Sequence, residues 1–301
     1  MIVVITSRSE YIDIDAYASC IGYRELLACF NIESKAVTTS LLNQSISWMI
    51  KDIPLKFDDY FPGAGDRFIV LDVSDPTHFD RIVLNHDYIS EVIDHHTGHE
   101  EYWAGKKEVR SQIEPIGSIA TIIYEKFIQS QKEEHLTSDL CKLLVAAIVD
   151  NTLNLKASIT NERDIVAFNQ LCKIGNIDYT WVQEYLESCE ENILNDLENA
   201  IKNDTKTIEV GALPCTFGQL VVFNHEKVLD NKKVIEDLYG VGNDWVVNII
   251  SLKSGKSYLM ATSGQSKRKL EKLFGKKFSD DVMVLDKFML RKEIIAKAVG
   301  K

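Results

Sequence analysis

An apolar run in the first half of the chain ends abruptly in residues that can bind metal ions. In the stretch YISEVIDHHTGHEEY (89–103), a buried-looking strand leads directly into Asp94-His95-His96, although the chain has only seven histidines. A carboxylate at a strand end is most often a turn residue, whereas carboxylates and imidazoles together are metal ligands. The pattern therefore predicts a metal or phosphate site if similar residues gather there from elsewhere.

Other apolar runs also end in aspartate. The carboxylates in question are Asp13 and Asp15 after the run 2–5, Asp72 after 68–71 and Asp150 after 144–149. Any one of them could be a turn or cap residue, but together they indicate carboxylates and imidazoles converging at one sheet edge. Such a cluster needs cations to offset its repulsion. Oxygen and imidazole ligands without cysteine suit Mn²⁺, Mg²⁺ or Co²⁺, and two ions about 3.5–4 Å apart could clamp a phosphoryl group.

The elements that would position these residues alternate between strand and helix. Short apolar runs at 2–5, 36–38, 68–71 and 91–93 predict strands, and the apolar spacing of 15–30 predicts a helix. This alternation favours an α/β domain with a parallel sheet, in which ligands bind at the carboxyl ends of the strands.

The rest of the chain predicts further helices and then a second, smaller α/β unit. The expected helices are 117–131, 136–149, 161–175 and 182–203, and the charged stretch 187–195 is the expected domain boundary. Beyond it, the expected strands are 216–223, 245–251 and 257–262, and the expected helices are 226–239 and 265–274.

Composition limits the class of protein. The 301 residues are 45% hydrophobic and 26% charged, with a formal net charge of −11, which argues against a nucleic-acid binder. The six cysteines are scattered without a C-x-x-C pair, as in a reduced cytoplasmic protein. No apolar stretch is long enough for a membrane span, so we expect no membrane partner. The expected partner is a small phosphate polyanion, and a homodimer is possible.

The acidic and histidine motifs resemble those of the DHH phosphoesterase superfamily. The matching elements are D-x-D (13–15), Asp72, D-H-H (94–96) and Asp150. The stretch VAAIVDNTL (145–153) and the turn Gly117-Ser118 are similar to family II inorganic pyrophosphatases. Those enzymes and the prune-like exopolyphosphatases form one branch, which has a C-terminal DHHA2 domain.

The second half of the chain also fits that branch. Residues 204–206 (DTK) resemble its D-x-K element, and 290–292 (LRK) stand where the family has S-R-K. The resemblance implies a DHH domain at 1–188 and a DHHA2 domain at 196–301, with the active site in the cleft between them.

The resemblance also implies a role for each position. The ligands of one metal ion would be Asp15, Asp72, His95 and Asp150. The ligands of the other would be Asp13 and Asp72, which bridges the two ions. The groups that neutralise the substrate would be His96, Lys206, Arg291 and Lys292. Asp94 would orient a ligand, and Asp13, Asp72 and His96 would act in catalysis, in which a metal-activated hydroxide attacks the terminal phosphorus of pyrophosphate or a short polyphosphate.

The first motif departs from the pyrophosphatase pattern at Ser9, where those enzymes have a metal-binding histidine. No histidine precedes His78 in this chain, so no neighbour in the sequence replaces it. The ion at that site is expected to bind weakly or to arrive with substrate. The prune-like enzymes have N-E-x-x-D-x-D here, which SEYIDID (9–15) resembles more closely. Leu290 likewise replaces the serine of S-R-K.

The sequence leaves several alternatives open. The protein could be an exopolyphosphatase acting on longer chains, or a phosphate- or nucleotide-binding regulator with weak turnover because of Ser9. The DHHA1 branch is disfavoured because the chain has no Gly-Gly pair. A P-loop at 255–257 is rejected because position 250 is isoleucine. His99 and His135 have no partners at a telling spacing and are expected to be solvated.

Overall fold

The computed structural model describes residues 1–83 and 85–300, which form two compact units. The first unit spans Met1–Tyr185 and the second Leu186–Lys301. The boundary expected at 187–195 falls within helix α7 (Tyr179–Asn195), which begins in the first unit and ends in the second.

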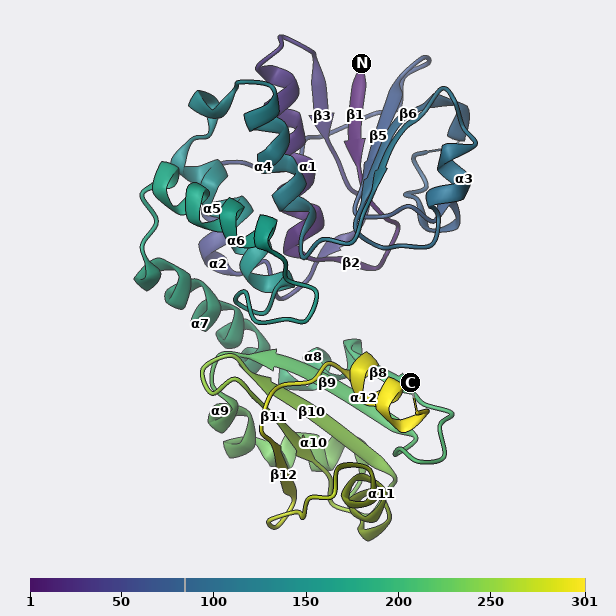
Figure 1. The fold of residues 1–301 in the computed structure, drawn as a ribbon, viewed down its shortest axis with the longest axis vertical. Coiled ribbons are helices and arrows are strands. Elements are labelled where there is room, and N and C mark those ends of the chain that lie inside the picture. The colour runs from purple at the N-terminus through teal and green to yellow at the C-terminus, as the bar shows by residue number, and fades with distance from the viewer. Residues whose placement is uncertain (84, 301) are drawn as a thin grey trace. The chain divides into compact units, whose positions relative to one another are not determined.

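A five-stranded parallel sheet forms the centre of the first unit (Figure 1), in the order β3-β1-β5-β6-β7. The strands are β1 (Ile2–Ile5), β3 (Ser34–Ala36), β5 (Arg67–Leu71), β6 (Ile89–Asp94) and β7 (Arg110–Ile113). All four neighbouring pairs are parallel. The predicted fold class, a parallel-sheet α/β domain followed by a second sheet domain, is confirmed.

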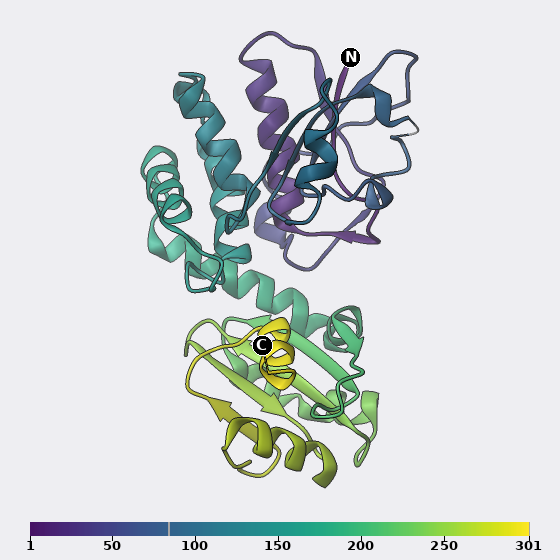
Figure 2. The ribbon, with the colours of Figure 1, turned by 45° about the vertical axis from the view of Figure 1, so that its right-hand side comes forward.

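Helices cover both faces of this sheet, which is why its strands read as nearly continuous apolar runs. Helix α1 (Ile14–Ala28) and helix α3 (Glu100–Ala104) lie on opposite faces (Figures 1 and 2). Trp103 of α3 is 1% exposed and belongs to the same buried apolar cluster as Val3, Val70 and Val92. Helices α4 (Ile119–Gln129) and α5 (Ser138–Asn151) pack against α1, and α6 (Glu162–Gly175) packs against both.

Short elements complete the first unit. They are the paired strands β2 (Tyr11–Ile12) and β4 (Leu41–Leu42), helix α2 (Trp48–Lys51) and the 3-10 helices η1 (Pro76–His78), η2 (His86–Tyr88) and η3 (Glu133–His135).

The strand order determines where a ligand would bind. Strand β1 pairs with β3 on one side and with β5 on the other, so the chain winds toward opposite edges from this point. In open α/β sheets the crevice for ligands lies at such a switch point, outside the carboxyl ends of the strands. Here those ends lead into the segments that carry Asp13, Asp15 and Asp72.

The second unit is a mixed five-stranded sheet in the order β12-β11-β10-β9-β8. The strands are β8 (Thr205–Thr207), β9 (Thr216–Val222), β10 (Trp245–Ser251), β11 (Lys256–Met260) and β12 (Val282–Leu285). The helices are α8 (Leu197–Asn203), α9 (His225–Asp230), α10 (Lys232–Tyr239), α11 (Gly264–Phe274) and α12 (Arg291–Ala298).

Two apolar clusters hold this second unit together, one on each face of its sheet. Helices α8, α9 and α10 pack on side chains such as Leu220 and Ile249. Helices α11 and α12 pack on the opposite side chains, such as Phe217 and Leu259. Because successive side chains of a strand point to opposite faces, both faces of this sheet are apolar and covered.

Two long helices expected from the sequence are each interrupted. The expected helix 182–203 is divided between α7 and α8 at Asp196, and the expected helix 226–239 between α9 and α10 at Asn231. Both residues are short polar side chains that compete with helical hydrogen bonding and favour helix caps. No helix in the described residues combines the length and the apolar content that a membrane crossing needs.

Candidate metal centre

Asp72 directly follows strand β5 and has an unusual backbone conformation. Its φ is 62°, in the left-handed region that a non-glycine residue adopts at a cost of roughly 1–2 kcal/mol. Its N–H nevertheless donates to Ile93 O at 3.0 Å, which continues the ladder between β5 and β6. The side chain is 9% exposed. Strain of this kind collects at functional sites.

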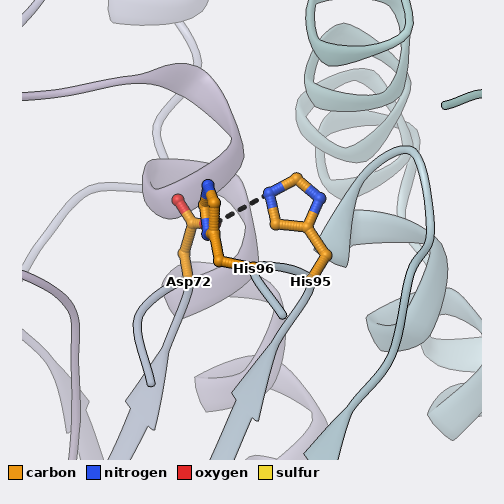
Figure 3. Close-up of side chains that lie close together, drawn as sticks. All are labelled: Asp72, His95 and His96. Carbon is orange, nitrogen blue, oxygen red and sulfur yellow. Dashed lines mark ion pairs between the residues drawn. The ribbon is translucent and has the colours of Figure 1, made fainter. Parts of the chain in front are cut away.

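The two histidines that follow β6 lie beside Asp72 (Figure 3). His95 Nε2 is 3.3 Å from Asp72 Oδ1, and His96 Nδ1 is 3.9 Å from the same oxygen. In the part of the chain that the structure describes, these three residues are the group whose ligand atoms all lie within 4.8 Å of one another. Asp72 Oδ1 is buried and has no hydrogen-bond partner. A buried carboxylate oxygen without a donor, facing two imidazoles, fits a divalent cation.

Backbone and carboxylate contacts fix the orientation of both rings. His95 Nδ1 is 3.0 Å from Ile116 O and donates to it, so Nε2 is the nitrogen that would bind an ion once it gives up its proton. His96 Nδ1 is 2.9 Å from Asp94 Oδ1, and the His96 N–H donates to the same oxygen at 3.0 Å. Asp94 therefore has the position expected for a residue that orients a ligand. His96 was predicted to bind substrate. Its Nδ1, at 3.9 Å, also lies close enough to Asp72 Oδ1 for the two atoms to bind one ion.

Burial and crowding shift the ionisation of these groups. Desolvation, reinforced by Asp13 and Asp15, raises the pKa of Asp72 to about 7. Desolvation works against a charged His95, but Asp72 and Asp15 outweigh it and raise the pKa of His95 to about 10. Burial likewise opposes the charge of Asp94, yet hydrogen bonds from His96 and Ser74 hold its pKa below the usual range. The centre thus gathers negative charge that a cation would offset.

The other predicted ligands belong to the same electrostatic cluster. Burial, together with the charges of Asp13 and Asp15, raises the pKa of Asp150 to about 7. Asp150 lies in the last turn of α5, one residue before Asn151. Asp13 caps α1, where its Oδ1 accepts from Ala16 N at 3.0 Å. These positions agree with a shared site, but the ligand roles themselves remain predictions.

Asp15 is held more tightly than the sequence suggests. It is fully buried, and its Oδ1 accepts from Ser118 Oγ at 2.7 Å and from Ala120 N at 3.1 Å. Its Oδ2 accepts from Ile119 N at 3.0 Å and from Asn151 Nδ2. The carboxylate therefore sits at the N-terminus of α4, where the helix dipole stabilises negative charge. To bind a metal ion, Asp15 would have to exchange one of these donors.

The turn before α4 has no room for a side chain at Gly117. Its N–H donates to Asp164 Oδ2 at 3.0 Å. A Cβ at this position would lie 2.5 Å from that oxygen and 2.6 Å from Thr152 Cγ2. This explains the glycine in the Gly117-Ser118 turn noted from the sequence.

Replacing Gly117 with alanine should lower the free energy of unfolding. Packing an extra methyl against Asp164 costs about 1–3 kcal/mol and displaces the turn that holds Asp15. Urea denaturation measures this directly. Gly105→Ala is the matched control, because a Cβ at Gly105 lies no closer than 3.4 Å to Tyr102 O. Equal stability of the two variants would contradict the interpretation.

A cavity of about 390 Å³ opens beside Asp72 in the first unit. This volume falls in the range of roughly 300–1,000 Å³ usual for small-molecule sites. Its lining includes Asp13, Ser9, Asp94 and His96. Ser9 Oγ accepts from Ser7 Oγ at 3.0 Å, so position 9 offers a neutral hydroxyl to the cavity. The three predicted catalytic residues, Asp13, Asp72 and His96, therefore line one cavity.

The same cavity contains residues that sequence reasoning missed. His99 was expected to be solvated without partners. Its side chain is 36% exposed, but it has a partner, because its Nε2 is 3.8 Å from Asp75 Oδ2, and it lines the cavity. His78 also lines the cavity, with Nδ1 3.7 Å from the same oxygen. The expectation for His135 agrees with the structure, since this ring is exposed and lies 3.3 Å from Glu134.

The three cations expected to bind substrate lie in the second unit in different environments. Lys206 and Lys292 are exposed. Arg291 is only 8% exposed, and its guanidinium donates to Phe217 O, Asp204 O and Asp204 Oδ1. Lys206 pairs with Phe217 across β8 and β9, so Arg291 lies beside it. Arg291 thus braces this end of the sheet, and its substrate contact remains a prediction.

Comparisons with known proteins agree with the fold and the motifs. Residues 2–148 match the model of the DHH family, N-terminal domain. The resemblance to the DHH superfamily noted from the sequence is confirmed by this match.

Relatives cover nearly the whole chain. A protein of Lactobacillus delbrueckii subsp. bulgaricus is 24% identical over 278 residues, which are 89% of this chain and 88% of that protein. A protein of Lactobacillus gasseri is 24% identical over 296 residues, with 93% and 92% covered. Both carry the name "Probable manganese-dependent inorganic pyrophosphatase".

Two solved structures share the fold over both units. A Methanococcus jannaschii protein described as a candidate family II inorganic pyrophosphatase has a TM-score of 0.63 and 22% identity, with 99% of this chain and 98% of that chain covered. An exopolyphosphatase-related protein from Bacteroides fragilis has a TM-score of 0.53 and 14% identity, with 98% and 89% covered. At these identities, the likeness establishes the fold.

Proposed function

We propose that this protein is a metal-dependent phosphoanhydride hydrolase that acts on inorganic pyrophosphate or short polyphosphate. The proposal rests mainly on the geometry around Asp72. This residue has a left-handed backbone, and its buried Oδ1, which has no hydrogen-bond partner, faces His95 and His96 beside a cavity. The match to the DHH family and the names of the relatives support the same reaction class.

The metal of choice in this proposal is manganese, in keeping with the mixed oxygen and imidazole donors and with the relatives' names. Its ligands would be drawn from Asp72, His95, Asp13 and Asp150, with Asp15 joining after it releases a donor. A bound ion would supply Lewis-acid polarisation of the phosphoryl oxygens and a lowered pKa for an attacking water. We also propose a second ion, which would bind more weakly because Ser9 replaces a metal-binding histidine.

The protein's own groups would bind and orient the substrate. His96, held by Asp94, would donate a hydrogen bond to a phosphoryl oxygen in the cavity. Ile116 O would keep the His95 ring in the tautomer that exposes Nε2. Lys206 and Lys292, with Arg291 beside them, would neutralise charge on the leaving phosphate. We propose that the second unit is a DHHA2 domain and, from the six free cysteines, that the protein works in a reducing compartment such as the cytoplasm.

Replacing Lys206 with alanine should raise KM for pyrophosphate about tenfold, because a hydrogen bond to a charged group contributes roughly 1.5–3 kcal/mol. Steady-state kinetics measures this change. Lys202→Ala is the control, since Lys202 is an exposed lysine of α8 paired with Glu198. Unchanged kinetics in Lys206→Ala would remove this residue from the substrate site.

The substrate is tested by phosphate release from pyrophosphate, tripolyphosphate and long-chain polyphosphate with Mn²⁺, Mg²⁺ or Co²⁺. The proposal expects the fastest release from pyrophosphate or the short chain. Faster release from long chains would favour the exopolyphosphatase alternative. That alternative is motivated by the SEYIDID stretch (9–15) and by the fold shared with the Bacteroides fragilis protein. Tight phosphate binding without turnover would indicate a regulator.

A further inference from the structure

A second group of metal-binding residues lies on the cavity that contains Asp72 and His96. Asp75 Oδ2 is 3.7 Å from His78 Nδ1 and 3.8 Å from His99 Nε2. Asp75 Oδ1 is occupied, because it accepts from Thr77 N at 2.9 Å and from Thr77 Oγ1 at 2.7 Å. One oxygen thus fixes the carboxylate while the other faces two imidazoles.

The two distances suit a bridging ion better than a direct contact. Both exceed the range of a hydrogen bond. Two ligand atoms that each lie about 2.1 Å from one ion are separated by at most about 4.2 Å, so each pair taken alone is close enough to share an ion. His78 is 65% exposed and His99 36%, which leaves room to turn. The present geometry requires such a turn to bring the two rings together, since only Asp72, His95 and His96 form a tight group among the described residues.

The fold brings this group to the cavity through long-range backbone pairing. Arg8 N donates to His78 O at 2.9 Å, and Ser7 forms a β-bridge with Phe79. Asp80 N donates to Thr6 O at 3.2 Å. The segment after β1 and the segment of η1 therefore run together, so Ser9 and His78 line the same cavity. His78 and His99 line the same cavity as Ser9, whose neutral hydroxyl is only a weak ligand.

We propose that Asp75, His78 and His99 bind a divalent transition-metal ion on the wall of this cavity. Two nitrogen donors and one oxygen donor suit Mn²⁺, Fe²⁺, Co²⁺ or Zn²⁺, whereas Mg²⁺ prefers an all-oxygen set. The inference rests on the proposed function in one respect: the ion would neutralise a second phosphate of a substrate held near Asp72. The charge of this ion would then compensate for the weaker metal binding expected where Ser9 replaces a histidine.

The test is the number of Mn²⁺ ions that the chelated full-length protein takes up, measured from the electron paramagnetic resonance of free Mn²⁺. The double variant His78→Ala/His99→Ala should lose one ion, or bind it at least about tenfold more weakly. His135→Ala, which removes an exposed imidazole outside the cavity, should match the wild type. His78→Gln, which keeps a polar side chain of similar length, serves as a second variant and should also weaken this ion.

Wild-type stoichiometry and affinity in the double variant would overturn the inference, whatever the hydrolytic activity. Imidazole-nitrogen coupling to bound Mn²⁺ is a second readout and should decrease in the double variant relative to His135→Ala. The proposed function fails separately, if the wild-type protein takes up Mn²⁺ but releases no phosphate from pyrophosphate. The two failures are therefore distinguishable.

Discussion

Replacing His95 with alanine is expected to lower the rate of phosphate release at least about 100-fold, since even groups that only orient metal ligands contribute about 10–100-fold. His95 Nε2 lies 3.3 Å from Asp72 Oδ1, and Ile116 O aligns the ring from the other side. The loss should appear in kcat, together with weaker Mn²⁺ binding.

The matched control for His95→Ala is His135→Ala. His135 is an exposed histidine beside Glu134 and should leave both activity and Mn²⁺ affinity unchanged. Circular dichroism and thermal unfolding would verify that His95→Ala remains folded. Retention of most of the activity in folded His95→Ala would contradict the assigned metal centre.

Removing metal ions should abolish phosphate release and should destabilise the protein most at alkaline pH. In the metal-free protein the pKa of Asp150 is raised from 3.8 to about 7, and that of Asp72 is raised in the same way. A raised pKa means that the folded state retains the proton longer than the unfolded state does. This contribution to stability is fully present below pH 3.8 and is lost as the pH rises through 7, by about 1.4 kcal/mol per pH unit for each group.

His95 acts in the same direction over a higher range. Its pKa is raised from 6.5 to about 10, so its contribution is present below pH 6.5 and is lost as the pH rises toward 10. Mn²⁺ binds the deprotonated ligands, so the stabilisation by the ion grows with pH. Thermal unfolding with and without Mn²⁺ should show a larger difference in Tm near pH 8 than near pH 6. An equal Tm difference at pH 6 and pH 8 would contradict the expectation that Asp72, Asp150 and His95 must lose protons before Mn²⁺ binds.

The convergence of Asp72 and His95 could be predicted because both follow buried parallel strands. The carboxyl ends of adjacent parallel strands meet at one edge, so an aspartate after β5 and a histidine after β6 must lie close together. The left-handed backbone of Asp72, which occurs together with its hydrogen bond to Ile93 O, was not predictable from the local sequence.

Other parts of the site depend on contacts between distant segments, which a single sequence does not reveal. The carboxylate of Asp15 accepts from Ser118 and from Ile119, more than 100 residues away. The group of Asp75, His78 and His99 gathers through the bridge between Ser7 and Phe79 and through the position of α3. Their spacing in the sequence carries no motif.

Some elements were missed for local reasons. Strand β7, with the sequence RSQI, is an edge strand with little buried apolar surface, so it lacks the usual pattern. Helix α12 (RKEIIAKA) is short and rich in charged residues, so the buried Ile294 that packs it on the sheet gives only a weak apolar pattern. The interior strands β5 and β10 were predictable because burial on both faces requires nearly continuous apolar runs.

The most direct test of the central claim is phosphate release from pyrophosphate by chelated protein to which Mn²⁺ is returned. We expect no release before Mn²⁺ is added, rapid release afterwards, and at least about 100-fold slower release by His95→Ala. Absence of release from wild-type protein that has bound Mn²⁺ would contradict the assignment of this centre to phosphoanhydride hydrolysis.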